Sequence, residues 1–232
     1  MNNHLYLIDS YRAVKARTAE AARRCGRDPA GVMLLAVSKT FPAEVVRQVA
    51  ELGQRDFGEN YLKEALEKIR ALADLDLCWH FIGPIQSNKT REIAENFTWV
   101  HSIDRLKIAR RLSEQRPDAL PPLQVCIQVN ISGEATKSGV APEDAPELAA
   151  EVAVLPRLRL RGLMAIPAPE IKFEAQRDVF RRLRRVQEDL CARGLALDTL
   201  SMGMSDDLEA AIAEGSTIVR VGSAIFGARA KQ

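Results

Sequence analysis

A single lysine stands where an apolar run ends and a helix is expected to begin. Lys39 closes the stretch VMLLAVSK, residues 32–39, and Pro42 follows three residues later. Proline is favoured in the first turn of a helix, so the end of the apolar run should be held firmly. An amine that follows a buried strand is partly desolvated, which lowers its pKa and makes it nucleophilic towards carbonyl groups. Lys39 is therefore a candidate for forming an imine with an aldehyde.

A compound held by an imine usually needs a second point of attachment. The last apolar run, IVRVG, leads into Gly222 and Ser223, where backbone N–H groups and a hydroxyl could hold a phosphate. Ser205 follows the preceding apolar run in the same way, and we expect it to cap the helix that comes next. A lysine and a phosphate-binding pair in one site would suit a phosphorylated aldehyde.

Short apolar runs recur along the chain with helical patterns between them. They cover residues 32–39, 55–60, 79–83, 98–103, 123–130, 161–166, 199–204 and 218–222. Alternating strands and helices are typical of a parallel sheet, and eight such units in 232 residues predict a closed (β/α)8 barrel. Residues 3–25 predict an additional amphipathic helix, ended by Gly26. We therefore expect residues 1–232 to form one α/β domain, a TIM barrel with an extra N-terminal helix.

An open doubly wound sheet is the alternative fold, but the GxGxxG motif usual after its first strand is missing. The barrel makes a further prediction, because barrel active sites lie at the carboxyl ends of the strands. Polar, glycine and proline residues collect at these ends, namely Lys39, Glu59, Asn60, Gly83, Pro84, Ser102, Asn130, Pro167, Ser205, Gly222 and Ser223. The pattern indicates a site at this face of the barrel.

The charge balance argues against a nucleic-acid or membrane partner. The chain has 33 Lys and Arg against 31 Asp and Glu, a net charge of +2, so no overall field would attract a polyanion. The basic stretch at residues 177–189 has a helical period that pairs Arg182, Arg184 and Arg185 with acidic residues four positions away. It also lacks an aromatic platform for bases. We expect a solvated helix face.

Cysteines and histidines are scattered rather than clustered, which predicts neither a metal site nor a disulfide framework. His4 and His101 have no partner histidine at metal-ligand spacing. The N-terminus lacks a basic start followed by an apolar block, and no apolar run approaches the roughly 20 residues that span a bilayer. We expect a cytoplasmic protein with reduced thiols at Cys25, Cys78, Cys126 and Cys191.

Several ordered motifs make the sequence recognisable. They are AVSKTFP, FGENYLKE, WHFIGPIQSNK, VHSIDR, VNISGEATKSG, GLMAIP, LSMGMSDDLEAAI and VRVGSAIFGAR. Together, from about residue 5 to residue 229, they resemble the pyridoxal phosphate homeostasis protein family. The resemblance implies a barrel similar to the N-terminal domain of alanine racemase. It also implies pyridoxal 5′-phosphate (PLP) as the cofactor, bound as a Schiff base to Lys39 of the AVSK motif.

The other cofactor-binding positions that the resemblance implies also lie on the late part of strands or just after them. They are Ser201, Met202, Gly222 and Ser223 around the phosphate, Arg220 near the pyridine nitrogen, Asn60 near the ring, and His80 and Met164 lining the mouth. No catalytic residue and no metal ligand is implied.

The group that faces the ring nitrogen decides how far PLP acts as an electron sink. Arginine stays protonated, so Arg220 would keep the nitrogen unprotonated and weaken carbanion stabilisation, which tells against transamination and decarboxylation. Racemisation stays possible, but it needs a second acid/base. In alanine racemase a second domain helps to build the site and the partner subunit supplies a tyrosine. This sequence ends at Gln232, just after the eighth strand, and only Tyr61 of its tyrosines closely follows a strand end.

We interpret the chain as a monomeric PLP carrier that serves vitamin B6 balance without a robust reaction, with apo-PLP enzymes as possible acceptors. The alternative is a weak PLP-dependent amino-acid racemase. A third hypothesis is a Schiff-base aldolase that needs no PLP. Lys137, on the loop after the fifth strand, could take PLP transiently, but we favour an amine that faces solvent.

Overall fold

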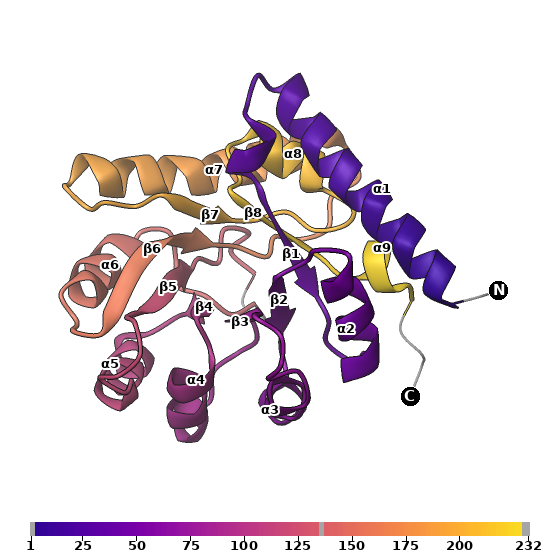
Figure 1. The fold of residues 1–232 in the computed structure, drawn as a ribbon. Coiled ribbons are helices and arrows are strands. Elements are labelled where there is room, and N and C mark those ends of the chain that lie inside the picture. Colours follow the sequence, from indigo (N-terminus) through magenta and orange to yellow (C-terminus); the bar gives the residue numbers. More distant parts are fainter. Residues whose placement is uncertain (1–2, 135–136, 229–232) are drawn as a thin grey trace.

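A closed barrel of eight parallel strands forms the centre of the molecule (Figure 1). The computed structural model describes residues 3–134 and 137–228. The strands are β1 Met33–Val37, β2 Asp56–Glu59, β3 Cys78–Phe81, β4 Trp99–Ile103, β5 Leu123–Gln128, β6 Leu158–Met164, β7 Thr199–Ser201 and β8 Ile218–Val221. Each strand pairs with the next in the chain, and β1 also pairs with β8, which closes the barrel.

Helices follow the strands and lie outside the barrel (Figure 1). They are α2 Ala43–Glu51, α3 Leu62–Ala71, α4 Thr90–Asn96, α5 Leu106–Gln115, α6 Ala145–Ala153, α7 Phe173–Ala192, α8 Leu208–Ala213 and the short α9 Ser223–Phe226. Two 3-10 helices, η1 Pro29–Gly31 and η2 Ser87–Lys89, lie in connecting segments. The predicted alternation of strand and helix, and with it the (β/α)8 barrel, is confirmed.

An additional helix, α1 Asn3–Arg24, precedes the barrel as predicted and packs against α2, α8 and α9. Its buried face carries Leu7, Tyr11 and Val14, the spacing of one side of a helix. Ser10 Oγ also donates a hydrogen bond of 2.6 Å to the carbonyl oxygen of Ile225 in α9. The helix therefore holds the segment that follows β8.

Arg17 of α1 makes a second attachment, to the segment that follows β7. Its guanidinium forms an ion pair with Glu209 of α8 and donates a 2.7 Å hydrogen bond to the carbonyl oxygen of Ser205. The backbone after each of the last two strands is thus fixed from outside the barrel.

Side chains alternate between two faces along each strand, because the strand period is two. The outward residues pack against the helices in the larger of two apolar clusters. The inward residues form a separate cluster in the barrel interior, which contains Leu35, Val37, Ile82, Trp99, Cys126, Met164 and Ile218. This alternation determines which residues can reach the mouth of the barrel.

The basic face of α7 differs in part from its prediction. The ion pair of Arg184 with Glu188 is confirmed at 3.3 Å. However, Arg177, Arg181 and Arg184 also converge on the buried carboxylate of Glu214, which follows α8, at 2.8, 3.0 and 3.2 Å. These arginines attach α7 to the end of α8 rather than forming an open cationic surface.

No helix in the described ranges combines the length and the apolar character that crossing a bilayer requires. The four cysteines are free thiols, of which Cys126 is buried in the barrel and Cys25 and Cys191 are exposed.

The glycine of β6, which lies against the backbone of β7, gives a test of the fold. A Cβ atom at Gly162 of β6 would lie 1.8 Å from the carbonyl oxygen of Thr199 in β7, so Gly162→Ala must push these strands apart. We expect it to lower the free energy of unfolding by about 2–3 kcal/mol in urea denaturation. Gly31→Ala is the matched control, because no heavy atom lies within 4 Å of its added carbon. Equal losses for the two variants would contradict the strand packing described.

Candidate functional site

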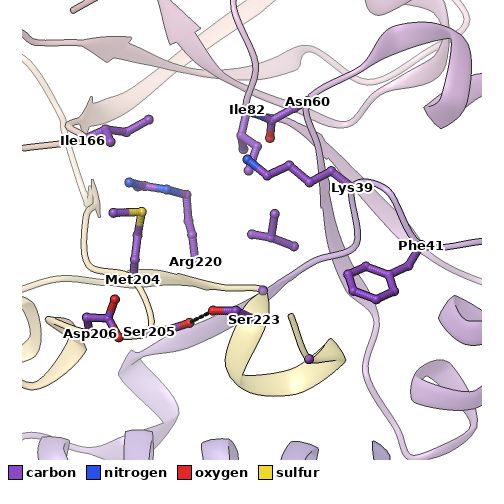
Figure 2. A pocket seen from close by; sticks show the side chains of 13 residues that line it. Lys39, Phe41, Asn60, Ile82, Ile166, Met204, Ser205, Asp206, Arg220 and Ser223 are labelled. Carbon is purple, nitrogen blue, oxygen red and sulfur yellow. Dashed lines mark hydrogen bonds between the residues drawn. The ribbon is translucent and has the colours of Figure 1, made fainter. Parts of the chain in front are cut away.

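A cavity of about 210 Å³ opens at the carboxyl ends of the strands (Figure 2). Strand ends and the segments after them supply its walls from parts of the chain that are far apart in sequence. The lining residues are Val37, Lys39, Phe41, Asn60, Ile82, Ile166, Met204, Ser205, Asp206, Arg220, Gly222, Ser223 and Gly227. The site expected at this face of the barrel is therefore present as a cavity.

The period of the strands explains why Lys39 enters this cavity. Leu35 and Val37 point into the barrel, so Lys39, two residues further along, continues the inward series at the rim. Figure 2 shows its side chain extending across the cavity towards Asn60 and Ile82. The amine therefore faces the cavity rather than the outer helices.

A buried ion-pair cluster fixes the backbone on both sides of Lys39. Ser38, which faces outward, donates its hydroxyl to Glu59 Oε1 at 2.6 Å, and its carbonyl oxygen accepts from Lys68 Nζ at 2.7 Å. Lys68 Nζ also pairs with Glu59 at 2.7 Å and with Glu64 at 2.5 Å. The end of β1 is thereby tied to β2 and α3.

The residue after Lys39 has an unusual backbone conformation. Thr40 has φ of +71°, a left-handed value that is costly for a residue with a Cβ. Its N–H donates a 2.6 Å hydrogen bond to Glu64 Oε1, the oxygen that also contacts Lys68. The cluster therefore holds the sharp turn that ends β1.

Arg220 is a buried cation at the base of the cavity. Its Nη1 donates to the carbonyl oxygen of Ser201 at 2.6 Å and to Ser201 Oγ at 2.8 Å, while Nη2 donates to Ala165 O at 2.8 Å. Burial lowers the pKa of Arg220 to about 10, and the charge of Asp207 opposes that shift. The guanidinium therefore stays protonated at neutral pH, in a fixed orientation.

Two hydroxyls meet on the side of the cavity opposite Lys39. Ser205 and Ser223 lie with their Oγ atoms 3.3 Å apart (Figure 2). The structure contradicts the expectation that Ser205 caps a helix. Helix α8 begins at Leu208, and Asp207 occupies its N-cap position. Asp207 instead accepts a 2.6 Å hydrogen bond from the N–H of Met204. The Ser205 hydroxyl is left on the cavity wall.

Of the residues implied by the resemblance, five line the cavity and four do not. Lys39, Asn60, Arg220, Gly222 and Ser223 are brought together there. His80, Met164, Ser201 and Met202 are instead fully buried below it or beside it.

The strand period gives the reason for this difference. His80 and Met164 face inward, but each lies two residues before the inward residue that reaches the cavity, Ile82 or Ile166. Ser201 likewise lies one inward repeat below the lining, under Arg220, and its neighbour Met202 packs in the outer apolar cluster. The role of these four residues in cofactor binding stays a prediction.

Sequence reasoning missed the apolar walls of the cavity. Ile82 and Ile166 could have been found from the strand period. Phe41 and Met204 come from segments after strands, and Phe41 is held by stacking on Phe226 of α9 with ring centroids 5.1 Å apart. No local pattern indicates that contact.

Two other residues considered from the sequence are not among those that line this cavity. Tyr61 is 53% exposed and precedes α3, outside the cavity lining. Lys137 forms an ion pair with Glu134 at 3.3 Å. Neither contributes to the walls described here.

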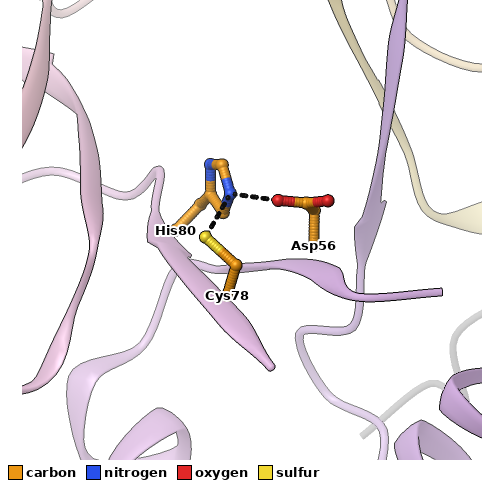
Figure 3. Close-up of side chains that lie close together, drawn as sticks. All are labelled: Asp56, Cys78 and His80. Carbon is orange, nitrogen blue, oxygen red and sulfur yellow. Dashed lines mark hydrogen bonds and ion pairs between the residues drawn. The ribbon is translucent and has the colours of Figure 1, made fainter. Parts of the chain in front are cut away.

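The opposite end of the barrel carries a cluster that the scattered sequence positions did not indicate (Figure 3). Ligand-type atoms of Asp56, Cys78 and His80 lie within 4.8 Å of one another. His80 Nε2 is 3.1 Å from Asp56 Oδ1 and 3.4 Å from Cys78 Sγ. Burial, with Asp56 nearby, raises the pKa of the Cys78 thiol to about 12, so the thiol is protonated at neutral pH.

Comparison with known proteins first defines a class. Residues 10–230 match the family model for the alanine racemase N-terminal domain. The alanine racemase of Clostridium difficile has the same fold with a TM-score of 0.74 at 15% identity, over 97% of this chain and 56% of that one. The closed barrel is therefore of the type found in the alanine racemase N-terminal domain.

Closer relatives define the family. A pyridoxal phosphate homeostasis protein of Pseudomonas aeruginosa is 66% identical over 223 residues, which are 96% of each chain. The structure of PipY from Synechococcus elongatus with PLP bound has a TM-score of 0.80 and 36% identity, covering 90% of this chain and all of that one. The chain belongs to the pyridoxal phosphate homeostasis protein family.

The ion-pair cluster behind Lys39 can be tested through its pH dependence. Lys68→Met would leave the Glu59 carboxylate, which is fully buried, without its cation, and we expect a loss of about 3–5 kcal/mol in the free energy of unfolding at pH 8. Burial already raises the pKa of Glu59, and Lys68 opposes this shift. Without Lys68 the pKa of Glu59 rises further. As pH falls, Glu59 is therefore protonated in the variant, which removes the cost of an unpaired buried charge. The loss should therefore be smaller at pH 5 than at pH 8.

The matched control is the double variant Glu59→Gln/Lys68→Met, which removes both charges. Its loss should be smaller than that of Lys68→Met at pH 8 and nearly independent of pH in the same urea titrations. A single-variant loss that does not change between pH 5 and pH 8 would contradict the proposed role of the pair.

Proposed function

We propose that this chain binds PLP as a Schiff base on Lys39 and serves the intracellular balance of PLP without a robust reaction of its own. The observation that carries the proposal is the entry of Lys39 into a cavity whose far wall holds the paired hydroxyls of Ser205 and Ser223. An aldehyde at the amine and a phosphate at the hydroxyls would occupy the two ends of one cavity. The family name and the PLP-bound PipY structure support the same conclusion.

The residues present fit this cofactor. Phe41, Ile82 and Ile166 offer apolar surface to a planar ring. Asn60 Oδ1 is buried and accepts no hydrogen bond from any described residue, so it is available to a donor on a bound molecule. The N–H groups of Ser223 and Ala224, at the start of α9, also have no intrahelical acceptor. Bound PLP supplies an electron sink at its ring.

The charge of Arg220 favours binding of the cofactor without use of its ring as an electron sink. Its guanidinium is protonated at neutral pH and can only donate hydrogen bonds, so it cannot share a proton with a ring nitrogen as a carboxylate can. An unprotonated ring withdraws electrons less strongly. Arg220 therefore suits a binding site better than a site for transamination or decarboxylation.

The racemase alternative requires a second acid/base group on the face of the bound substrate that is turned away from Lys39. Within the described ranges, the lining offers one carboxylate, that of Asp206. It lies on the Ser205 side, where we place the phosphate. This arrangement does not favour racemisation.

We further propose that the protein acts in the cytosol, as a monomer, and that its partners are PLP and apo-PLP enzymes that receive it. The free thiols and the near balance of charges support this setting. Neither nucleic acid nor a membrane is part of the proposal.

The Schiff base is tested by replacing the amine. Wild-type protein loaded with PLP should show visible absorbance that borohydride bleaches, and Lys39→Ala should lose it. Lys137→Ala is the matched control, because it removes a lysine outside the cavity lining and should keep the absorbance. Retention of the absorbance in Lys39→Ala would exclude Lys39 as the attachment point. In the same preparations, steady formation of D-alanine from L-alanine that depends on Lys39 would favour the racemase.

The phosphate position is tested with two nearly isosteric variants. Ser223→Asp places a negative charge beside the proposed phosphate, so PLP should bind at least about tenfold more weakly than to Ser223→Asn. Pyridoxal, which has no phosphate, should bind the two variants equally. Equilibrium dialysis measures both ligands. A preference for Ser223→Asn that is as large with pyridoxal as with PLP would show that the phosphate lies elsewhere.

A further inference from the structure

A chain of hydrogen bonds crosses the barrel interior, from the base of the cavity to the amino-terminal end of the strands. Arg220 Nη1 lies 2.8 Å from Ser201 Oγ, which lies 2.8 Å from His101 Nδ1. His101 Nε2 lies 3.0 Å from His80 Nδ1, and His80 Nε2 lies 3.1 Å from Asp56 Oδ1. Each member of this chain comes from a different strand.

The two ends of the chain determine the direction of every hydrogen bond in it. Arginine can only donate, and an ionised carboxylate can only accept. His80 Nε2 must therefore carry the hydrogen that faces Asp56. A neutral His80 then has a lone pair on Nδ1 and must accept from His101 Nε2–H. A neutral His101 must in turn accept on Nδ1 from the hydroxyl of Ser201.

Both histidines lie where the neutral form is favoured. Each side chain is fully buried, and burial lowers the pKa of both. The charge of Arg220 and the neighbouring His80 lower the pKa of His101 further. The ring of Trp99 stacks on His80 with centroids 5.5 Å apart and planes 5° from parallel, which leaves apolar surroundings on that side.

We propose that His80, His101 and Ser201 are positioning residues for Arg220, held as a one-directional hydrogen-bond chain that ends on Asp56; this inference rests on the proposed PLP site. Because Ser201 gives its hydroxyl hydrogen to His101, the oxygen presents a lone pair to Arg220. Arg220 is then held by three acceptors, Ser201 O, Ser201 Oγ and Ala165 O. Three residues that do not line the cavity thus set the orientation of Arg220, which does line it.

The same assignment bears on the cluster at the far end of the barrel. A cation bound between Asp56 and Cys78 would need the lone pair of His80 Nε2, and His80 would then carry its hydrogen on Nδ1. The hydrogen-bond chain requires the opposite tautomer, with the hydrogen of His80 on Nε2. The tautomer of His80 therefore shows whether Asp56 ends the hydrogen-bond chain or belongs to a metal-binding cluster.

The first experiment measures the tautomers directly, on wild-type protein without PLP. Long-range 1H–15N NMR at pH 7 should show His80 and His101 both neutral and both carrying hydrogen on Nε2, with peaks assigned from His80→Gln and His101→Gln. A hydrogen on Nδ1 of either residue, or a cationic form of either, would overturn the proposal. This result does not depend on whether PLP binds.

The second experiment asks whether the hydrogen-bond chain affects the binding of PLP. His101→Leu removes both bonds of that residue, so we expect PLP to dissociate roughly fivefold faster, with a shifted visible maximum. His101→Gln keeps one acceptor and one donor and should restore most of both values. Cys126→Ala is the matched control, since it alters the same interior outside the chain and should leave the maximum unchanged.

Equal spectra for His101→Leu and wild-type protein would overturn the positioning role. A shift of the same size in Cys126→Ala would overturn it too, because general loosening of the interior would then be the cause. If all variants still form a borohydride-sensitive adduct on Lys39, the proposed function stands whichever way this test falls.

Discussion

Side-chain alternation along β1, within a closed barrel, is the constraint on which the site depends. It turns Ser38 outward, to the buried Glu59 and Lys68, and Lys39 inward, to the cavity. A shift of one residue would exchange the two and bury the nucleophile against the helices. The ion-pair cluster fixes this register from outside, and closure of β1 on β8 brings the end of β1 next to the segment that carries Ser223.

The interior beneath the cavity is polar in a way that an ordinary barrel core is not. Leu35, Val37 and Met164 fill much of it, yet Arg220 and two histidines share the same space. A buried cation without a carboxylate bonded to it is costly unless hydrogen bonds compensate, and here two carbonyl oxygens and one hydroxyl oxygen accept from three of its N–H groups. Such an arrangement keeps a positive charge near the cavity without offering a proton acceptor.

The apolar runs were enough to predict the eight strands, the order of strand and helix, and Lys39 at the rim, since all of these are local patterns. The level of each residue along its strand was harder. Motif resemblance identifies a strand but not the depth of a residue along it. His80 and Met164 lie one inward repeat below the side chains that line the cavity. The contact of Phe41 with Phe226 and the chain from His80 to Ser201 join residues far apart in sequence, which periodicity alone cannot bring together.

Peptide mapping of the PLP-loaded protein after borohydride reduction identifies the amine that holds the cofactor. We expect one pyridoxyl group per chain, located by mass spectrometry on the peptide that contains Lys39. A pyridoxyl group found chiefly on Lys137 or another surface lysine, with Lys39 unmodified, would contradict this expectation.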